Sequence, residues 1–415
     1  MFMVAGAVKA ERWEAHEWGT FTTFQNSAGG RVPWYPAQEN RAAELPEFVG
    51  FNVQGVGKGF GFNYVARMET PVIYFYTDKP RAVDVRANYR GGAVTEWYPF
   101  GRAETTNGVA APFVYPGAQQ VVDRVAVWEN LFVLPFGHES LSEVKPPVAD
   151  SDRGNHYYEA REVPEAALVL DNNRETAQAE RFVFYRGAGP MDGRVVASLE
   201  KGGKFTVTNH HRGEAMTHTW AVRVENGTMA WGQMPVFPKA GEKPMTAEML
   251  LDGSGNVEFE KSVPAIENSF VEALTESGLT SSEAKAMVNT WESSWFTEAG
   301  TRVFTIMPVS VVEEMLPLQI DPAPRKLGRV FVHSMEILSP ETESLLIAAL
   351  DESEVSQETA RRVAAMELGR FESAAFEMSG RSRNARFEQE TRDRMGAVIS
   401  ASRNAAETKA VALSD

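Results

Sequence analysis

The 415-residue sequence contains no cysteine, which excludes disulfide bonds, thiol nucleophiles and thiolate metal sites. It has no run of about 18 apolar residues, the length that a membrane-spanning helix needs. Basic residues are also few: 41 Lys and Arg stand against 56 Asp and Glu, giving a net charge of −15. Because this field repels phosphate backbones, we expect no nucleic-acid partner. The metalloprotease, serine-hydrolase, P-loop and dinucleotide motifs are absent as well.

The first ten residues are small and apolar, and they contain two small-x-Ala sequences, Ala5-Gly6-Ala7 and Val8-Lys9-Ala10. Such sequences are typical of signal-peptide cleavage sites. Residues 1–10 therefore favour the remnant of a signal peptide and an exported, periplasmic or extracellular protein. The alternative is an ordinary frayed N-terminus.

The hydrophobic pattern predicts a mainly β fold. Residues 71–76 form a short apolar run, typical of a strand buried on both faces, and two further strands near 83–89 and 94–98 follow at hairpin spacing. These three segments predict an antiparallel meander. Further short strands separated by turn residues continue to about residue 259, as in a sandwich or barrel.

The pattern changes at Pro264, and it divides the chain into regions. We expect an antiparallel β-sandwich or distorted barrel core at 11–262 and an α/β extension at 263–338. Thr280 and Glu283 form a predicted capping box that opens a helix in this extension. The region 339–415 is predicted to be a helical tail, which begins at Ser339-Pro340 and could join two copies of the chain.

Several aromatic and charged motifs together resemble a known family. They are His16-Glu17-Trp18-Gly19-Thr20, Met68-Glu69-Thr70-Pro71, Thr95-Glu96-Trp97-Tyr98-Pro99, His156-Tyr157-Tyr158, Phe182 to Gly187 and Gly300-Thr301-Arg302. They resemble an uncharacterised family of exported bacterial proteins that begin, after a signal peptide, with the same His-Glu-Trp-Gly-Thr sequence. The resemblance covers residues 14 to 340. It implies export, and it supplies no activity or catalytic role.

The first group of candidate residues consists of His16, Glu17, Glu69, Glu96 and His156. Imidazoles and carboxylates suit zinc, iron or manganese, and we expect His16 and His156 to hold one divalent transition metal, most simply zinc. Glu96 would be the base or a third ligand. The alternative is that the carboxylates form structural ion pairs and that His16 is a satisfied, partly buried histidine.

The second group surrounds His156. Tyr157 and Arg161 are candidates for proton donor and anion clamp, and Arg186 and Arg302 could join Arg161 in binding substrate. Trp18 and Trp97 are candidates for stacking against a substrate ring. In the alternative interpretation these arginines neutralise buried carboxylates and most of the aromatic residues belong to the core.

Other histidines and methionines give weaker signals. His211 and His218 would face each other if residues 212–217 formed a hairpin loop, whereas the lone His138 and His333 are read as structural. Methionines such as Met216 could bind copper through their soft thioethers, although no Met-x-Met motif supports this.

We therefore expect an exported hydrolase, metal-assisted or not, that acts on a polysaccharide or peptide. The alternative is a non-catalytic envelope or extracellular protein that binds a polymeric or small-molecule ligand through an aromatic loop surface. A catalytic protein would gather histidine and carboxylate groups with shifted pKa values in one cleft. A binding protein would instead expose a broad aromatic patch.

Overall fold

A computed structural model of the protein describes most of the chain, and these residues are called the described residues below. They are 11–32, 45–51, 66–105, 124–138, 145–148, 155–171, 178–191, 194–211, 214–237, 245–251, 253, 255–352, 354–383 and 389–414. The expected signal-peptide remnant at 1–10 lies outside them. The protein is mainly β, with antiparallel sheets and a helical C-terminal region, as the sequence predicts.

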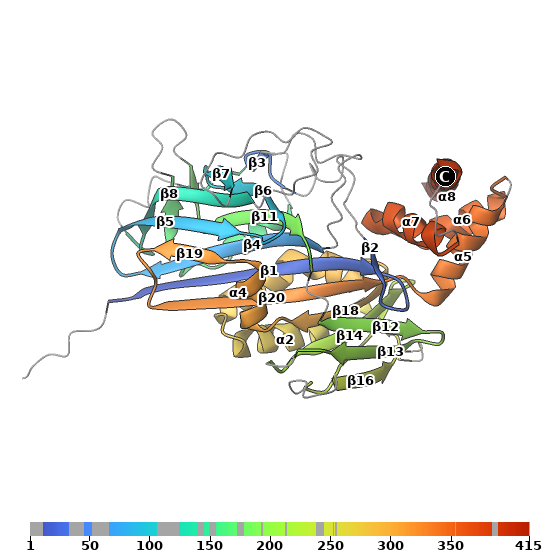
Figure 1. Ribbon diagram of the computed structural model, residues 1–415, viewed down its shortest axis with the longest axis horizontal. Helices are drawn as coiled ribbons and strands as arrows, with labels where there is room; N and C mark the ends of the chain where they lie inside the picture. Colours follow the sequence, from blue (N-terminus) through green and yellow to red (C-terminus); the bar gives the residue numbers. More distant parts are fainter. Residues whose placement is uncertain are drawn as a thin grey trace, which may run out of the picture.

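The first strand, β1 (Trp13–Gln25), lies at the centre of a large sheet (Figure 1). It pairs in parallel with β20 (Lys326–Ile337) and in antiparallel with β4 (Ala66–Thr77). Beyond β20 the sheet continues through β18 (Gly300–Ile306) to β14 (Thr219–Glu225). The boundary expected near residue 263 therefore does not divide the sheet, because β18 and β20 follow it in sequence and lie beside β1.

The predicted meander is wrong, although its three strands exist. Strand β5 (Arg81–Asn88) pairs with β8 (Arg124–Leu134) and β19 (Leu318–Asp321), whereas β4 pairs with β1 and β11 (Val183–Gly189). Strand β6 (Ala93–Tyr98) also pairs with β11. Hairpin spacing was misleading because the chain leaves one layer after β4 and starts another with β5.

Both faces of β4 are covered, which explains its continuous apolar sequence. Ile73 and Phe75 pack with residues of β5 and β8 such as Val85, whereas Tyr74 and Tyr76 belong to a second core shared with the helices. Strand layers therefore pack face to face on one side of the central sheet. The described strands form this sandwich-like arrangement and no closed barrel.

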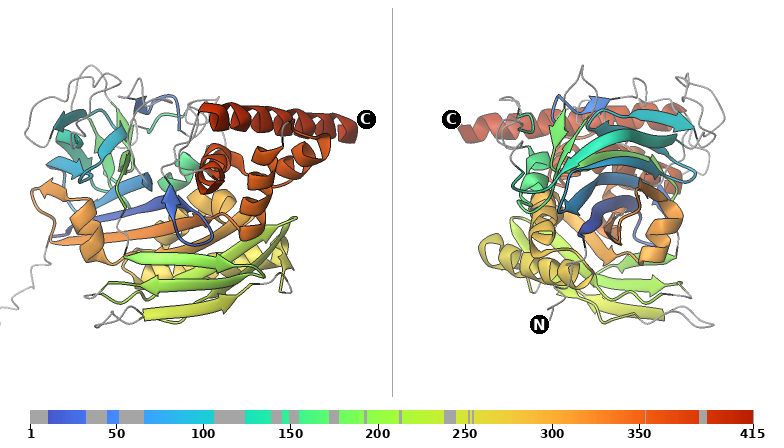
Figure 2. Two further views of the ribbon diagram at one scale, coloured as in Figure 1. Left: turned by 45° about the vertical axis from the view of Figure 1, so that its right-hand side comes forward. Right: turned by 90° about the vertical axis from the view of Figure 1, so that its left-hand side faces the viewer.

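A smaller three-stranded sheet packs against the large one at the end that holds β14 and β18 (Figure 2). Its strands are β12 (Val195–Glu200), β13 (Lys204–Asn209) and β16 (Met245–Leu250). Because β13 pairs with β12 and β16, it forms no hairpin with β14. The hairpin that would have placed His211 opposite His218 is therefore absent from the described residues.

Two helices cover the other face of the central sheet. They are α2 (Phe259–Glu276) and α3 (Ser281–Glu292), and α3 begins with the predicted capping box between Thr280 and Glu283. Helix α3 runs directly into a π-helical turn, η4 (Ser293–Thr297). Such turns are rare and often occur at functional sites.

The helical tail has its own small core beside the end of β1 (Figure 2). Helix α5 (Pro340–Asp351) begins at the predicted cap, Ser339, and α6 (Gln357–Ala364), α7 (Glu372–Arg383) and α8 (Gln389–Ser414) follow it. Phe24 of β1 stacks on Phe371 of the tail, with ring centroids 5.1 Å apart. No helix among the described residues is long and apolar enough to cross a membrane.

The remaining elements are short. They are β2 (Arg31–Val32), β3 (Gly50–Phe51), β7 (Arg102–Thr105), η3 (His156–Arg161), β9 (Leu168–Leu170), β10 (Ala179–Glu180), β15 (Thr228–Gln233), β17 (Val257–Glu258), α4 (Val309–Met315) and η5 (Gly369–Phe371).

Candidate functional site

A cleft of about 460 Å³ opens beside the end of α3 and the π-helical turn η4. Four separate parts of the chain line it: Glu69 of β4, His156 and Glu159 of η3, residues 289–294 with 297 and 298, and Arg370 of η5. The cleft therefore lies where the central sheet, the helical layer and the C-terminal tail meet. We call it the acidic cleft, because four glutamates and one arginine line it.

One of the four glutamates is already neutralised. Glu69 is buried, and its Oε1 lies 3.0 Å from Arg67 Nη1 and 2.9 Å from Arg370 Nη1. Thr22 Oγ1 donates a further hydrogen bond of 2.5 Å to Glu69 Oε2. Glu69 thus holds the tail residue Arg370 in place at the cleft.

The other three glutamates are Glu159, Glu292 and Glu298, and no ion pair to any of them is found among the described residues. Burial raises the pKa of Glu298 above its usual range. Arg370 opposes this effect, and the negative charges of Glu336 and Glu69 add to it. Glu298 therefore keeps its proton to a higher pH than an ordinary glutamate, which is a property of general acids.

His156 lies on the wall of the cleft against an aromatic side chain. Its ring centroid is 5.3 Å from that of Trp291, in an edge-to-face arrangement, and Trp291 stacks on Trp295. Asn155 caps the short helix η3, because its side chain accepts a hydrogen bond of 2.9 Å from the Tyr157 amide. The cap and the tryptophan hold the imidazole beside the glutamates.

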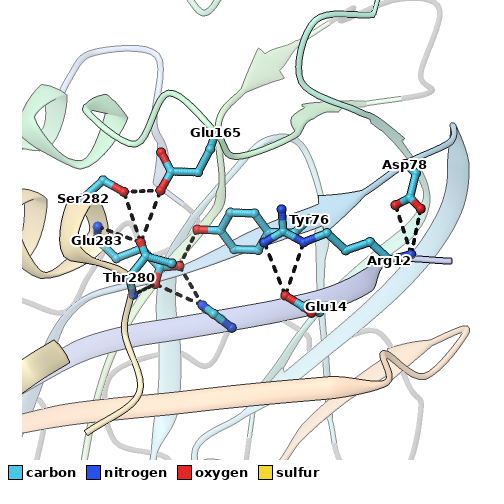
Figure 3. A network of polar contacts seen from close by, with 9 residues as sticks. Arg12, Glu14, Tyr76, Asp78, Glu165, Thr280, Ser282 and Glu283 are labelled. Carbon is cyan, nitrogen blue, oxygen red and sulfur yellow. Dashed lines mark hydrogen bonds and ion pairs between the residues drawn. The ribbon is translucent and has the colours of Figure 1, made fainter. Parts of the chain in front are cut away.

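The structure places His16 elsewhere. Its Nδ1 lies 3.0 Å from Glu283 Oε2, and Glu283 also accepts hydrogen bonds from Tyr76 Oη (2.6 Å) and the Thr280 amide (2.7 Å) (Figure 3). We call this set the Glu283 hub. Burial raises the pKa of Glu283, but the hydrogen bond and charge of His16, with the other two donors, outweigh it and lower the pKa overall.

His16 and His156 are not brought together. His16 contacts the first turn of α3 through Glu283, whereas His156 contacts Trp291 at its last turn, and His16 does not line the acidic cleft. At 1.5 Å per residue, these two helix positions are about 12 Å apart along the axis. No group of three histidine, aspartate or glutamate side chains that could hold a metal ion is found among the described residues.

The expected pair Tyr157 and Arg161 faces a buried carboxylate instead of the cleft. Arg161 Nη2 lies 2.7 Å from Glu180 Oε2, and Tyr157 Oη donates a hydrogen bond of 3.1 Å to the same oxygen. Burial raises the pKa of Glu180, and Arg161 opposes it; burial also raises the pKa of Tyr157. This cluster fits the alternative that the sequence analysis offered, in which the arginines neutralise buried carboxylates.

Arg302 has a similar structural position. Its Nε lies 3.0 Å from Glu336 Oε2, and its Nη1 donates to the carbonyl oxygens of Ser294 and Trp295, both at 2.9 Å. This buried arginine therefore fixes the π-helical turn η4, which lines the acidic cleft. It acts on the site through the backbone and does not line the cleft itself.

The remaining candidates lie inside the sheet. Glu96 and Arg186 are buried neighbours on the paired strands β6 and β11. Trp18 and Trp97 are buried in the two main hydrophobic cores, one on each side of the central sheet. None of these four residues lines the acidic cleft.

The sequence interpretation missed Glu292, Glu298 and Arg370. Each comes from a different turn or element, and no short motif contains them together. The one local signal was the density of aromatic and charged residues at 291–302, which the family motifs touch at Gly300-Thr301-Arg302.

Comparisons with known proteins add little. No family model matches the chain, and no curated protein matches it. Among solved structures, a yeast delta-COP-I mu-homology domain complexed with a Dsl1 WxWxV peptide aligns with 80% of this chain and 98% of its own. The sequence identity is 4% and the TM-score is 0.27. A TM-score this low gives no argument about fold or function.

Proposed function

We propose that this protein is a hydrolase that cleaves a polysaccharide or peptide in the acidic cleft, with Glu298 as the proton donor. The supporting observation is that burial raises the pKa of Glu298 inside a cleft that also contains His156 and two further glutamates. This is the convergence of titratable groups that distinguishes a catalytic site from a binding surface.

Hydrolysis of a glycosidic or amide bond needs one group that donates a proton and one that activates water. Glu298 supplies the first. His156, Glu159 and Glu292 line the same cleft and are the candidates for the second. The excess of carboxylates favours a neutral or cationic substrate over a polyanion.

Two further parts of the proposal depend on the sequence alone. Export to the periplasm or the cell exterior follows from the family resemblance and the small-x-Ala sequences before residue 11. A divalent transition metal such as zinc stays a prediction, and in the folded protein it would have to use His156 without His16. Neither part is needed for acid–base hydrolysis by Glu298.

The test is hydrolysis of a panel of chromogenic glycosides and fluorogenic peptides by the parent protein and Glu298→Gln. We expect at least one substrate to be cleaved and the variant to lose about 100-fold or more in kcat, the usual contribution of a general acid. The matched control is Glu272→Gln, which changes an exposed glutamate on α2. Cleavage that is unchanged in Glu298→Gln, or a panel without any cleavage, would refute the proposal.

The second candidate is the non-catalytic binding protein. Phe100 and Phe136 support it, because their side chains are 52% and 61% exposed. Glycan and peptide arrays distinguish the two functions. Binding that Phe100→Ala and Phe136→Ala abolish, and that Glu298→Gln leaves intact, would favour this candidate over the hydrolase.

A further inference from the structure

A second cavity lies in the interior, away from the acidic cleft. It measures about 10 Å³, and its lining brings together two histidines and three methionines: Met191, His211, Met216, Met307 and His333. His333 belongs to β20, Met307 follows β18, and Met216 forms an isolated bridge with Phe237 beside the small sheet. The cavity shares no lining residue with the acidic cleft.

His333 is buried and held in one orientation at the cavity. Its Nε2 lies 2.9 Å from Thr23 Oγ1, and this hydrogen bond fixes the ring. The other ring nitrogen, Nδ1, takes no part in this hydrogen bond. At many metal sites a hydrogen bond to one ring nitrogen orients the imidazole in this way.

The donor set selects the type of ion. No carboxylate lines the cavity, so a hard cation such as calcium or magnesium would find no suitable ligand. Thioether sulfur and imidazole nitrogen are the ligands that select copper(I). The volume is about that of one water probe, which suits a single ion and leaves little room for anything larger. Val195, Thr305, Pro308 and Val311 complete the lining.

We propose that this cavity binds one copper(I) ion through the imidazoles of His211 and His333 and the thioethers of the lining methionines. Sequence reasoning assigned His333 to a structural role and found no methionine motif. The sequence does not reveal that these residues line one cavity, because they come from five separate places between residues 191 and 333. The site is independent of the hydrolase proposal.

Anaerobic titration with copper(I), in competition with a chromogenic copper(I) chelator, tests the proposal. The parent protein should retain one equivalent, and silver(I) should compete for the same site. Met216→Leu and Met307→Leu conserve volume, so they should fold while they weaken copper(I) binding at least tenfold. Met229→Leu is the matched control, because Met229 is equally buried in another core.

His333→Gln should abolish the tight site, and urea unfolding of each variant shows whether its fold is intact. Two results would overturn the proposal. One is a parent protein that loses all copper(I) to the chelator. The other is binding that is the same in Met216→Leu, Met307→Leu and the Met229→Leu control, which would assign the copper to surface groups such as His210.

Discussion

Replacing Glu283 with alanine should be among the most destabilising single changes in the chain. The side chain is fully buried and accepts hydrogen bonds from His16, Tyr76 and the Thr280 amide. Alanine leaves these three buried donors without an acceptor, at about 1–3 kcal/mol each. The expected loss is therefore about 3–9 kcal/mol, a large fraction of the 5–15 kcal/mol by which such proteins are stable.

The effect should also depend on pH. Because the pKa of Glu283 is lower in the folded protein than in the unfolded chain, its ionised form stabilises the fold above the unfolded value of about 4.3. That contribution is lost as the pH falls through the folded pKa. The stability difference between the parent protein and Glu283→Ala should accordingly shrink in acid.

The assay is urea unfolding at pH 7 and at acid pH, with Glu272→Ala on the exposed face of α2 as control. Tyr76→Phe, which removes one donor and keeps the ring, should cost about 1 kcal/mol. A Glu283→Ala protein within about 1 kcal/mol of the control would refute the Glu283 hub as a stabilising element.

Three other changes test the surroundings of the two sites, each by urea unfolding. Gly328→Ala would place a Cβ 3.1 Å from His16 Cδ2, so it should cost about 1–3 kcal/mol; no loss would mean that the ring has room. Arg302→Met leaves Glu336 buried without its partner and should cost about 3–5 kcal/mol, and a neutral result would contradict the role of this ion pair. Glu298→Gln should stabilise the protein at pH 7, because a carboxyl with a raised pKa is costly to ionise in the fold. That gain should vanish as the pH falls toward 4, and a loss at pH 7 would contradict it.

Local signals in the sequence predicted local structure well. The Thr280–Glu283 capping box and the Ser339 cap both start helices where they were expected, and the apolar run at 71–76 lies in a strand buried on both faces. These features depend on neighbouring residues, so the sequence alone contains the information.

Long-range pairing could not be predicted. Strand β1 lies beside β20, with His16 opposite Gly328, so partners are more than 300 residues apart. Hydrophobic pattern specifies which face of a strand is buried, and it carries no information about the identity of the neighbouring strand. For the same reason His16 was assigned to a metal site with His156, when its partner is Glu283, 267 residues away.

The candidate site illustrates a second limit. Glu69 and His156 were recognised from the sequence, but Glu298 and Arg370 were not, because a raised pKa and a concave surface exist only in the folded chain. Trp18 stood out by its aromatic character and proved to be core. Aromatic residues in strands are most often buried, so their presence near charged residues is weak evidence for a binding surface.

The most direct test of the account is the titration of the Glu298 carboxyl group by carbon-13 NMR, with the resonance assigned by its absence in Glu298→Gln. This measurement needs no knowledge of the substrate. The account predicts a midpoint above the ordinary glutamate value of about 4.3, because burial disfavours the charged form. A midpoint at or below that value would contradict the assignment of Glu298 as the proton donor of the acidic cleft.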